Sequence, residues 1–153
     1  MKDSITIHPI GHVSSTVTNQ IDEGWGQVTS LIEVLPPHRQ GLIGLDQFSH
    51  VIVVTFLHQA VFDPHRHLRR RPRGLASMPE VGIFAQRAKD RPNPIGITAV
   101  PIVKVLPEAI EVRGLDAIHG TPVLDLKPYY PAYDLVRGAS VPEWVDRLMA
   151  GYF

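Results

Sequence analysis

One stretch of this chain concentrates positive charge in a way that suits phosphate. From His65 to Arg73, five arginines occupy nine positions, although the whole chain balances fifteen basic against fifteen acidic residues. Arginine forms paired hydrogen bonds with phosphate oxygens, so the stretch predicts contacts with phosphate or nucleic acid. A solvated loop that only improves solubility is the alternative. The residues predicted to make these contacts are Arg66, Arg69, Arg70, Arg71, Arg73, Lys89 and Arg91.

The turn from Arg91 to Thr98 is a second candidate. Pro92 and Pro94 fix the backbone on both sides of Asn93, so that its amide can be presented to a ligand. A tight turn that leads into a strand explains the same spacing, and spacing alone favours that simpler interpretation.

Carboxylates and histidines form a third group. Asp116 and Asp125 lie on either side of His119, an arrangement that could serve the acid–base chemistry of a hydrolase. Asp116 is equally well explained as a turn residue that bonds its own backbone, and no hydroxyl nucleophile completes a triad. His65 and His67 lie two positions apart, but the chain has no cysteine and no third ligand at a suitable spacing. We therefore expect no metal site.

Short strands must position these residues. The 153-residue chain is 44% hydrophobic, which is enough for one domain over residues 1–153 with a real core. Its fourteen prolines and twelve glycines argue against long helices. Segments rich in β-branched residues predict strands at 5–10, 28–35, 51–57, 81–85, 97–105 and 110–114. This pattern is typical of a sandwich or a barrel, so a mainly β fold is expected.

One helix is predicted near the C-terminus, at about residues 140–150. Ser140 and Glu143 have the spacing of a capping box, and Pro142 would lie in the first turn. The apolar face of this helix would comprise Val141, Trp144, Val145, Leu148 and Met149. A second short helix or turn is indicated at 41–50.

Two long connections are also expected. Residues 58–80 form a loop too long to be a mere connector, and residues 125–141 are expected to wrap over the body of the fold. Residues 1–4 show no apolar stretch of a secretory signal, and the longest apolar run, Val51 to Leu57, is too short to span a bilayer. We therefore expect a cytoplasmic protein without a membrane partner.

Several blocks of sequence, in order along the chain, resemble the signature of the TsaA/TrmO-like family. Together they span roughly residues 5–133, and the last two blocks are highly specific as a pair. The blocks are Ile10–Ser15, Leu45–His50 with His58-Gln59, Gly82–Arg87, Arg91–Gly96 and Leu115–Tyr129.

The resemblance implies a β-barrel that binds S-adenosyl-L-methionine and methylates the exocyclic nitrogen of threonylcarbamoyladenosine, beside the anticodon of tRNA. It also implies a homodimer whose active site lies near the subunit interface. The basic stretch would then bind tRNA. Carried over by motif, the cofactor contacts are His58, Gln59, Arg87, Ile97, Thr98, Gly114, Leu115, Asp116, Ala117 and Ile118.

Individual roles follow from the chemistry of these side chains. Asp116 would accept hydrogen bonds from the methionine ammonium or the ribose hydroxyls, and Arg87 would pair with the methionine carboxylate. Ile97 and the turn 115–118 would form an apolar slot for the adenine. The candidate catalytic residues are Asn93, as the holder of the target amino group, and Asp116.

The sequence departs from the family pattern in two places. Enterobacterial-type members carry Pro-Arg-Gln after the first strand, where this chain has Asp22–Gly26, so Trp25 or the backbone is expected to replace that cofactor contact. The chain also ends soon after the signature region, whereas longer members add a C-terminal domain that helps to hold tRNA. An S-adenosyl-L-methionine-binding protein with another RNA or small-molecule substrate, or a regulatory module without catalysis, therefore stays open.

Overall fold

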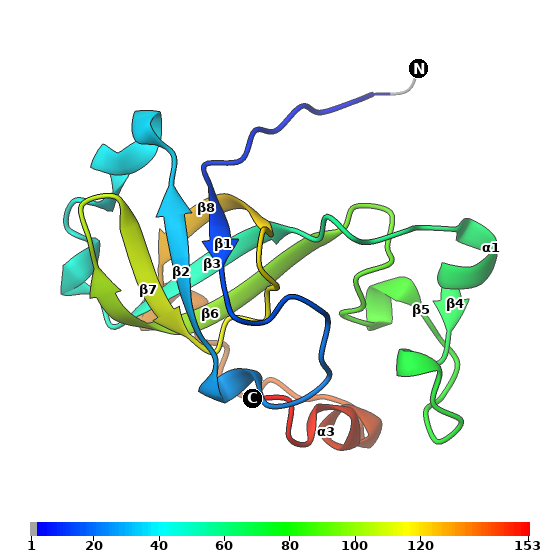
Figure 1. Ribbon diagram of the computed structural model, residues 1–153. Coiled ribbons are helices and arrows are strands. Elements are labelled where there is room, and N and C mark those ends of the chain that lie inside the picture. The colour runs from blue at the N-terminus through cyan, green and yellow to red at the C-terminus, as the bar shows by residue number, and fades with distance from the viewer. Residues whose placement is uncertain (1–2) are drawn as a thin grey trace.

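Six strands close into a β-barrel in the computed structural model, which describes residues 3–153 (Figure 1). Around the barrel the order is β1-β2-β7-β6-β3-β8, and each neighbouring pair is antiparallel. The expected mainly β barrel is therefore confirmed. The strands are β1 (Gly11–Ser14), β2 (Thr29–Val34), β3 (His50–Phe56), β6 (Ile95–Val105), β7 (Ala109–Arg113) and β8 (Pro122–Pro128).

Alternation along each strand places the core inside the barrel. On β3, Val51, Val53 and Thr55 are buried while the residues between them are partly exposed, as a strand with one covered face requires. The centre of the core is built mostly from β-branched side chains, which suit packing on a pleated surface. Its fully buried members include Val13, Ile32, Val51, Val53, Val100, Ile110, Val112 and Val123.

Strand β8 was not predicted, and it is the strand that closes the barrel. It lies between β1 and β3, and its residues 125–128 belong to the segment that was expected to wrap over the fold. Prolines at both ends and the charged Asp125 obscured the pattern, yet proline is tolerated at strand ends. After β8 the chain forms the short helix α2 (Pro131–Asp134).

Of the predicted strands, the one at 5–10 is wrong and the one at 81–85 is shorter than expected. Among the described residues before Gly11 no strand forms, and Ile5 and Ile7 are exposed because no neighbouring strand covers them. Met1 and Lys2 lie outside the described residues. In the segment 81–85 only β5 (Val81–Gly82) is extended, and it passes at once into the 3₁₀ turn η5 (Ile83–Ala85).

Short 3₁₀ segments occupy the region where a second short helix or turn was indicated. The segment 41–50 contains the end of η2 (Pro36–Leu42) and the 3₁₀ turn η3 (Leu45–Gln47), and another such turn, η1 (Trp25–Gln27), precedes β2. The long loop 58–80 holds α1 (Pro64–His67), β4 (Arg69–Arg70) and η4 (Pro72–Gly74). Strand β4 pairs with β5, so this excursion is a small unit on one side of the barrel (Figure 1).

The predicted C-terminal helix is present as α3 (Glu143–Met149), but its capping box is not. Pro142 occupies the N-cap position with an extended backbone, and its carbonyl accepts the Val145 N–H at 3.0 Å. The helix therefore starts too late for Ser140 to cap it. Glu143 instead pairs with Arg147, 2.8 Å away on the same helix face. No helix within residues 3–153 combines the length and the apolar character needed to cross a membrane.

Packing inside the barrel predicts a steep cost for truncating a central side chain. Ile110 on β7 is 0% exposed, so Ile110→Ala should lower the free energy of unfolding by about 2–5 kcal/mol in urea denaturation. Ile43, which is 84% exposed, provides the control: Ile43→Ala should change the same quantity by less than about 0.5 kcal/mol. Equal losses in the two variants would contradict the placement of the core.

Candidate functional site

Between β7 and β8, Asp116 is the one partly exposed residue in the otherwise buried segment 114–118. The turn begins at Gly114, whose φ of 81° is readily adopted only by glycine and whose N–H donates to the Val28 carbonyl at 2.8 Å. Leu115, Ala117 and Ile118 are all buried and anchor the segment in the barrel. Their side chains are therefore part of the core, and the segment offers a ligand its main chain and one carboxylate.

Two hydroxyl groups hold the Asp116 carboxylate. The Thr98 hydroxyl on β6 donates to Oδ1 at 2.5 Å, and the Tyr152 hydroxyl donates to Oδ2 at 2.7 Å. A carboxylate has about four acceptor positions, so these two bonds leave acceptor capacity for a ligand. Tyr152 was not among the predicted site residues, because it lies 36 positions from Asp116 in the sequence and outside every recognised block.

The C-terminal segment brings Tyr152 to this place by pairing with the start of η1. Gly24 and Trp25 donate their N–H groups to the Gly151 and Tyr152 carbonyls at 2.8 and 2.9 Å. A Cβ atom at Gly26 would lie 2.6 Å from the Phe153 carbonyl carbon, so this close approach requires glycine.

Burial raises the pKa of the Tyr152 phenol, and the nearby negative charge of Asp116 raises it further. The phenol therefore stays protonated at neutral pH and acts as a hydrogen-bond donor to Asp116 rather than as a base.

Trp25, a predicted cofactor contact, is buried under this segment. Its indole N–H donates to the Ile21 carbonyl at 3.0 Å. The only polar atom of its side chain is therefore already hydrogen-bonded within the fold. The role of Trp25 toward a cofactor stays a prediction.

Three more predicted cofactor residues are connected to Asp116, one directly and two through β6. Thr98 bonds it directly, and the neighbouring Ile97 is 52% exposed on the outer face of β6. Arg87 donates from Nη2 to the Ile97 carbonyl at 2.5 Å. The structure thus connects Arg87 to Asp116 through the main chain of β6, while the Ile97 and Thr98 side chains lie on opposite faces of that strand.

His58, Gln59 and Asn93 meet at the end of β3. The Leu57 N–H donates to the Pro94 carbonyl at 2.7 Å, which places the segment after β3 beside the Pro-Asn-Pro turn. All three side chains are exposed. Among the described contacts none joins this group to Asp116, so the predicted site residues form two groups around β6.

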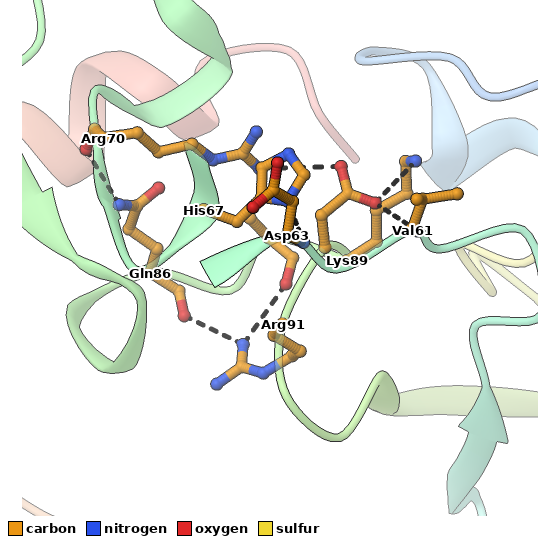
Figure 2. A network of polar contacts seen from close by, with 9 residues as sticks. Val61, Asp63, His67, Arg70, Gln86, Lys89 and Arg91 are labelled. Carbon is orange, nitrogen blue, oxygen red and sulfur yellow. Dashed lines mark hydrogen bonds and ion pairs between the residues drawn. The ribbon is translucent and has the colours of Figure 1, made fainter. Parts of the chain in front are cut away.

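The basic excursion is organised from within by a buried glutamine (Figure 2). The side-chain amide of Gln86 donates to the main-chain carbonyls of Arg70 and Val81 at 3.0 and 2.9 Å. The Arg91 guanidinium donates to the main-chain carbonyl of Gln86 at 3.0 Å. Nε of Arg70 is buried, and its Nη2 lies 3.9 Å from the carboxylate of Asp90. Arg70 and Arg91 therefore support the loop itself.

Asp90 ties this excursion to the end of β3. It accepts the Val61 N–H at 3.0 Å and pairs with Lys89 at 3.0 Å. Burial alone would raise the pKa of Asp90, but the Val61 hydrogen bond, Lys89 and His67 together outweigh burial and hold that pKa below its ordinary value. The charged carboxylate thus stabilises the loop.

Most of the remaining arginines also have partners. Arg69 lies 2.9 Å from Glu80, Arg73 lies 3.7 Å from Asp22, and Arg71 donates to the Met78 carbonyl. Arg66 and Arg69 stay well exposed, Arg69 with 74% of its side chain accessible. Fewer arginines of the loop are therefore unpaired than its composition suggests. The seven predicted RNA contacts stay predictions.

The carboxylate-pair interpretation gains no geometric support. Asp125 pairs with Lys127 at 2.6 Å on β8, and His119 accepts the Ser15 N–H at 3.4 Å. Asp116 shares no partner with either of them among the described contacts. Within residues 3–153, no cluster of three or more metal-ligating side chains is found.

Comparison with known proteins places this geometry in a family. Residues 20–135 match the family model described as tRNA-methyltransferase O N-terminal domain. The chain belongs to this family. The family membership that the ordered sequence blocks predicted is confirmed.

Two curated relatives and one crystal structure show the range of the similarity. A human tRNA (adenine(37)-N6)-methyltransferase is 39% identical over 107 residues, which cover 70% of this chain and 23% of that protein. An S-adenosyl-L-methionine-binding protein of Archaeoglobus fulgidus is 36% identical over 135 residues, covering 86% of this chain and 94% of that protein. The crystal structure of TrmO from Pseudomonas aeruginosa matches with a TM-score of 0.77 and 29% identity, over 94% of this chain and 63% of that one. This chain spans about three fifths of the length of other curated relatives that it matches.

The lowered pKa of Asp90 predicts a pH-dependent contribution to stability. Such a carboxylate stabilises the fold above its ordinary value of 3.8, and this stabilisation is lost as pH falls through the folded-state pKa. Asp90→Asn should therefore lower the free energy of unfolding at pH 7 by about 1–2 kcal/mol, and the gap from the unchanged protein should narrow below about pH 4. Urea denaturation across this range measures the gap. Asp46→Asn, at an exposed position, is the control, and an equal gap for both variants at every pH would contradict the role of Asp90.

Proposed function

We propose that this protein is an S-adenosyl-L-methionine-dependent methyltransferase that acts on the exocyclic nitrogen of threonylcarbamoyladenosine beside the tRNA anticodon. The observation that carries the proposal is the Asp116 carboxylate, which two hydroxyls hold and which keeps free acceptor positions. Thr98, one of the two donors, follows Ile97, whose carbonyl accepts from Arg87. Membership in a family of tRNA methyltransferase domains supports it. We take residues 1–153 as one domain of this kind.

The residues around Asp116 fit the groups that the cofactor presents. Free acceptor positions on Asp116 suit the methionine ammonium or the ribose hydroxyls, and Arg87 uses only part of its five N–H donors on Ile97, so it can also bind a carboxylate. Ile97 offers an exposed apolar surface to the adenine, and the turn 114–118 offers backbone groups. The proposed contacts from other segments are His58, Gln59 and Trp25.

The reaction requires these residues mainly to position the target amino group relative to the methyl donor. S-adenosyl-L-methionine, when bound, supplies an electrophilic methyl group. We propose that the exposed Asn93, held rigid between two prolines, accepts a hydrogen bond from the target amino group and orients it. Orientation of this kind can supply a large part of a rate enhancement without a strong base.

The basic excursion is proposed to bind the tRNA backbone. Arg66 and Arg69 are the residues best placed for direct phosphate contacts because they are exposed, whereas Arg70 and Arg91 hold the loop in shape. Arg69, Arg71, Arg73 and Lys89 each have a partner within the fold that phosphate would have to share or displace.

A homodimer is part of the same proposal. Exposed apolar side chains near the cofactor residues, among them Ile95 and Phe84, are suited to burial against a second copy. We also propose that the protein works in the cytoplasm, where its RNA substrate occurs.

A binding protein without transferase activity, or one with another RNA or small-molecule substrate, is the second candidate. The Archaeoglobus fulgidus relative, which this chain covers almost completely, is named only as an S-adenosyl-L-methionine-binding protein. A regulatory module of this type would need the cofactor site but not the exposed arginines.

The direct test is methyl transfer by the purified protein. Transfer RNA carrying threonylcarbamoyladenosine is incubated with S-adenosyl-L-methionine, digested and measured by mass spectrometry of its nucleosides. A gain of one methyl group on that nucleoside is expected. Cofactor binding without any methylated product would favour the second candidate.

Asp116→Ala and Arg87→Ala should each weaken S-adenosyl-L-methionine binding without unfolding the protein. Each removes a charge-assisted contact, so a loss on the order of 1.5–3 kcal/mol in binding free energy is expected in calorimetry. Unchanged affinity in both variants would remove these residues from the site.

Phosphate contacts from the loop predict a specific salt dependence. A variant with both Arg66→Ala and Arg69→Ala should bind tRNA with a slope of log affinity against log salt reduced by up to about two phosphate contacts, while its cofactor affinity stays unchanged. Arg39→Ala is a matched control for Arg69, because Arg39 also pairs with an exposed glutamate but lies in η2, away from the excursion (Figure 1). An equal salt slope of tRNA affinity in the double variant and the control would show that Arg66 and Arg69 do not contact RNA phosphates.

A further inference from the structure

Tyr152 links the C-terminal segment to the candidate site, and no recognised block of the sequence contains it. We propose that Tyr152 is a positioning residue whose hydroxyl fixes the orientation of the Asp116 carboxylate toward the cofactor. This inference rests on the cofactor site proposed above. It adds residues 151–153 to the segments of the chain that build the site.

The contacts at Asp116 support a positioning role. Its two oxygens each accept one hydroxyl, from Thr98 at 2.5 Å and from Tyr152 at 2.7 Å. Two donors on different oxygens prevent the carboxylate plane from rotating, so its remaining acceptor positions keep a single direction. A ligand then meets an acceptor that needs no reorganisation, which lowers the cost of binding.

Tyr152 is itself held from several sides. Its carbonyl accepts the Trp25 N–H at 2.9 Å, and its ring packs edge-on against Phe153 with centroids 4.8 Å apart. The guanidinium of Arg73 lies 5.7 Å from the centre of the Tyr152 ring, and the same side chain reaches Asp22. The hydroxyl is therefore directed by both the barrel and the basic excursion.

The backbone pairing makes the hydroxyl separable from the fold. Main-chain bonds from Gly24 and Trp25 hold the segment whatever the side chain at position 152. Tyr152→Phe keeps the ring, its contact with Phe153 and its place under Arg73, and removes only the bond to Asp116. This variant is therefore expected to fold.

The experiment is a double-mutant cycle in S-adenosyl-L-methionine binding, measured by calorimetry on the full chain. Tyr152→Phe should raise the dissociation constant about threefold to tenfold. In a protein that already carries Asp116→Ala, the same change should have less than a twofold effect, because the carboxylate it positions is gone. A purely structural role would weaken binding by the same factor in both backgrounds.

Controls and outcomes separate the two proposals. Tyr133→Phe, at a tyrosine that is 86% exposed, should leave binding unchanged, and thermal unfolding confirms that each variant is folded. If Asp116→Ala weakens binding but Tyr152→Phe does not, the role of Tyr152 is overturned while the cofactor site stands. If Tyr152→Phe tightens binding, the tyrosine blocks the site and the inference is overturned. If Asp116→Ala itself has no effect, the cofactor site fails and this inference fails with it.

Discussion

Closure of the barrel by β8 is the constraint on which the rest of the structure depends. The strand lies between β1 and β3, and its Val123 is completely buried while its carbonyl accepts the Ile10 N–H at 2.8 Å. Without β8, both β1 and β3 would expose an unpaired edge. The turn 114–118 that carries Asp116 leads directly into this strand, so the core that closes the barrel also fixes the carboxylate.

The basic excursion beside the barrel contains two kinds of arginine. Arg70 and Arg91 use their donors on Asp90 and on carbonyl groups, where they replace backbone partners that an irregular loop lacks. Arg66 and Arg69 point into solvent. The arginines of the basic excursion therefore have two roles. Arg70 and Arg91 hold the loop in shape. Arg66 and Arg69 are exposed, and among the described contacts only the pairing of Arg69 with Glu80 competes with an anion there.

Local patterns predicted much of the fold, and they failed where tertiary contacts decide. The strands β2, β3, β6 and β7 were found because apolar alternation and turn residues mark them, whereas β8 was missed because prolines and Asp125 interrupt its pattern. The segment 5–10 has strand-like residues but no neighbour to pair with. Among the site residues, Thr98, Arg87 and Asp116 came from the family resemblance. Tyr152 could not be predicted, since only the pairing of residues 151–152 with Gly24 and Trp25 brings it to Asp116.

The tight fit of Phe153 against Gly26 bears on how the protein should be handled. Because the Phe153 main chain lies where a Cβ atom of residue 26 would be, any peptide fused after it starts beside the pairing of residues 151–152 with Gly24 and Trp25. An affinity tag attached after Phe153 would disturb the main-chain pairing that positions Tyr152. Residues 3–8 are exposed and form no strand, so the opposite end of the chain is the better attachment point for purification and for surface immobilisation.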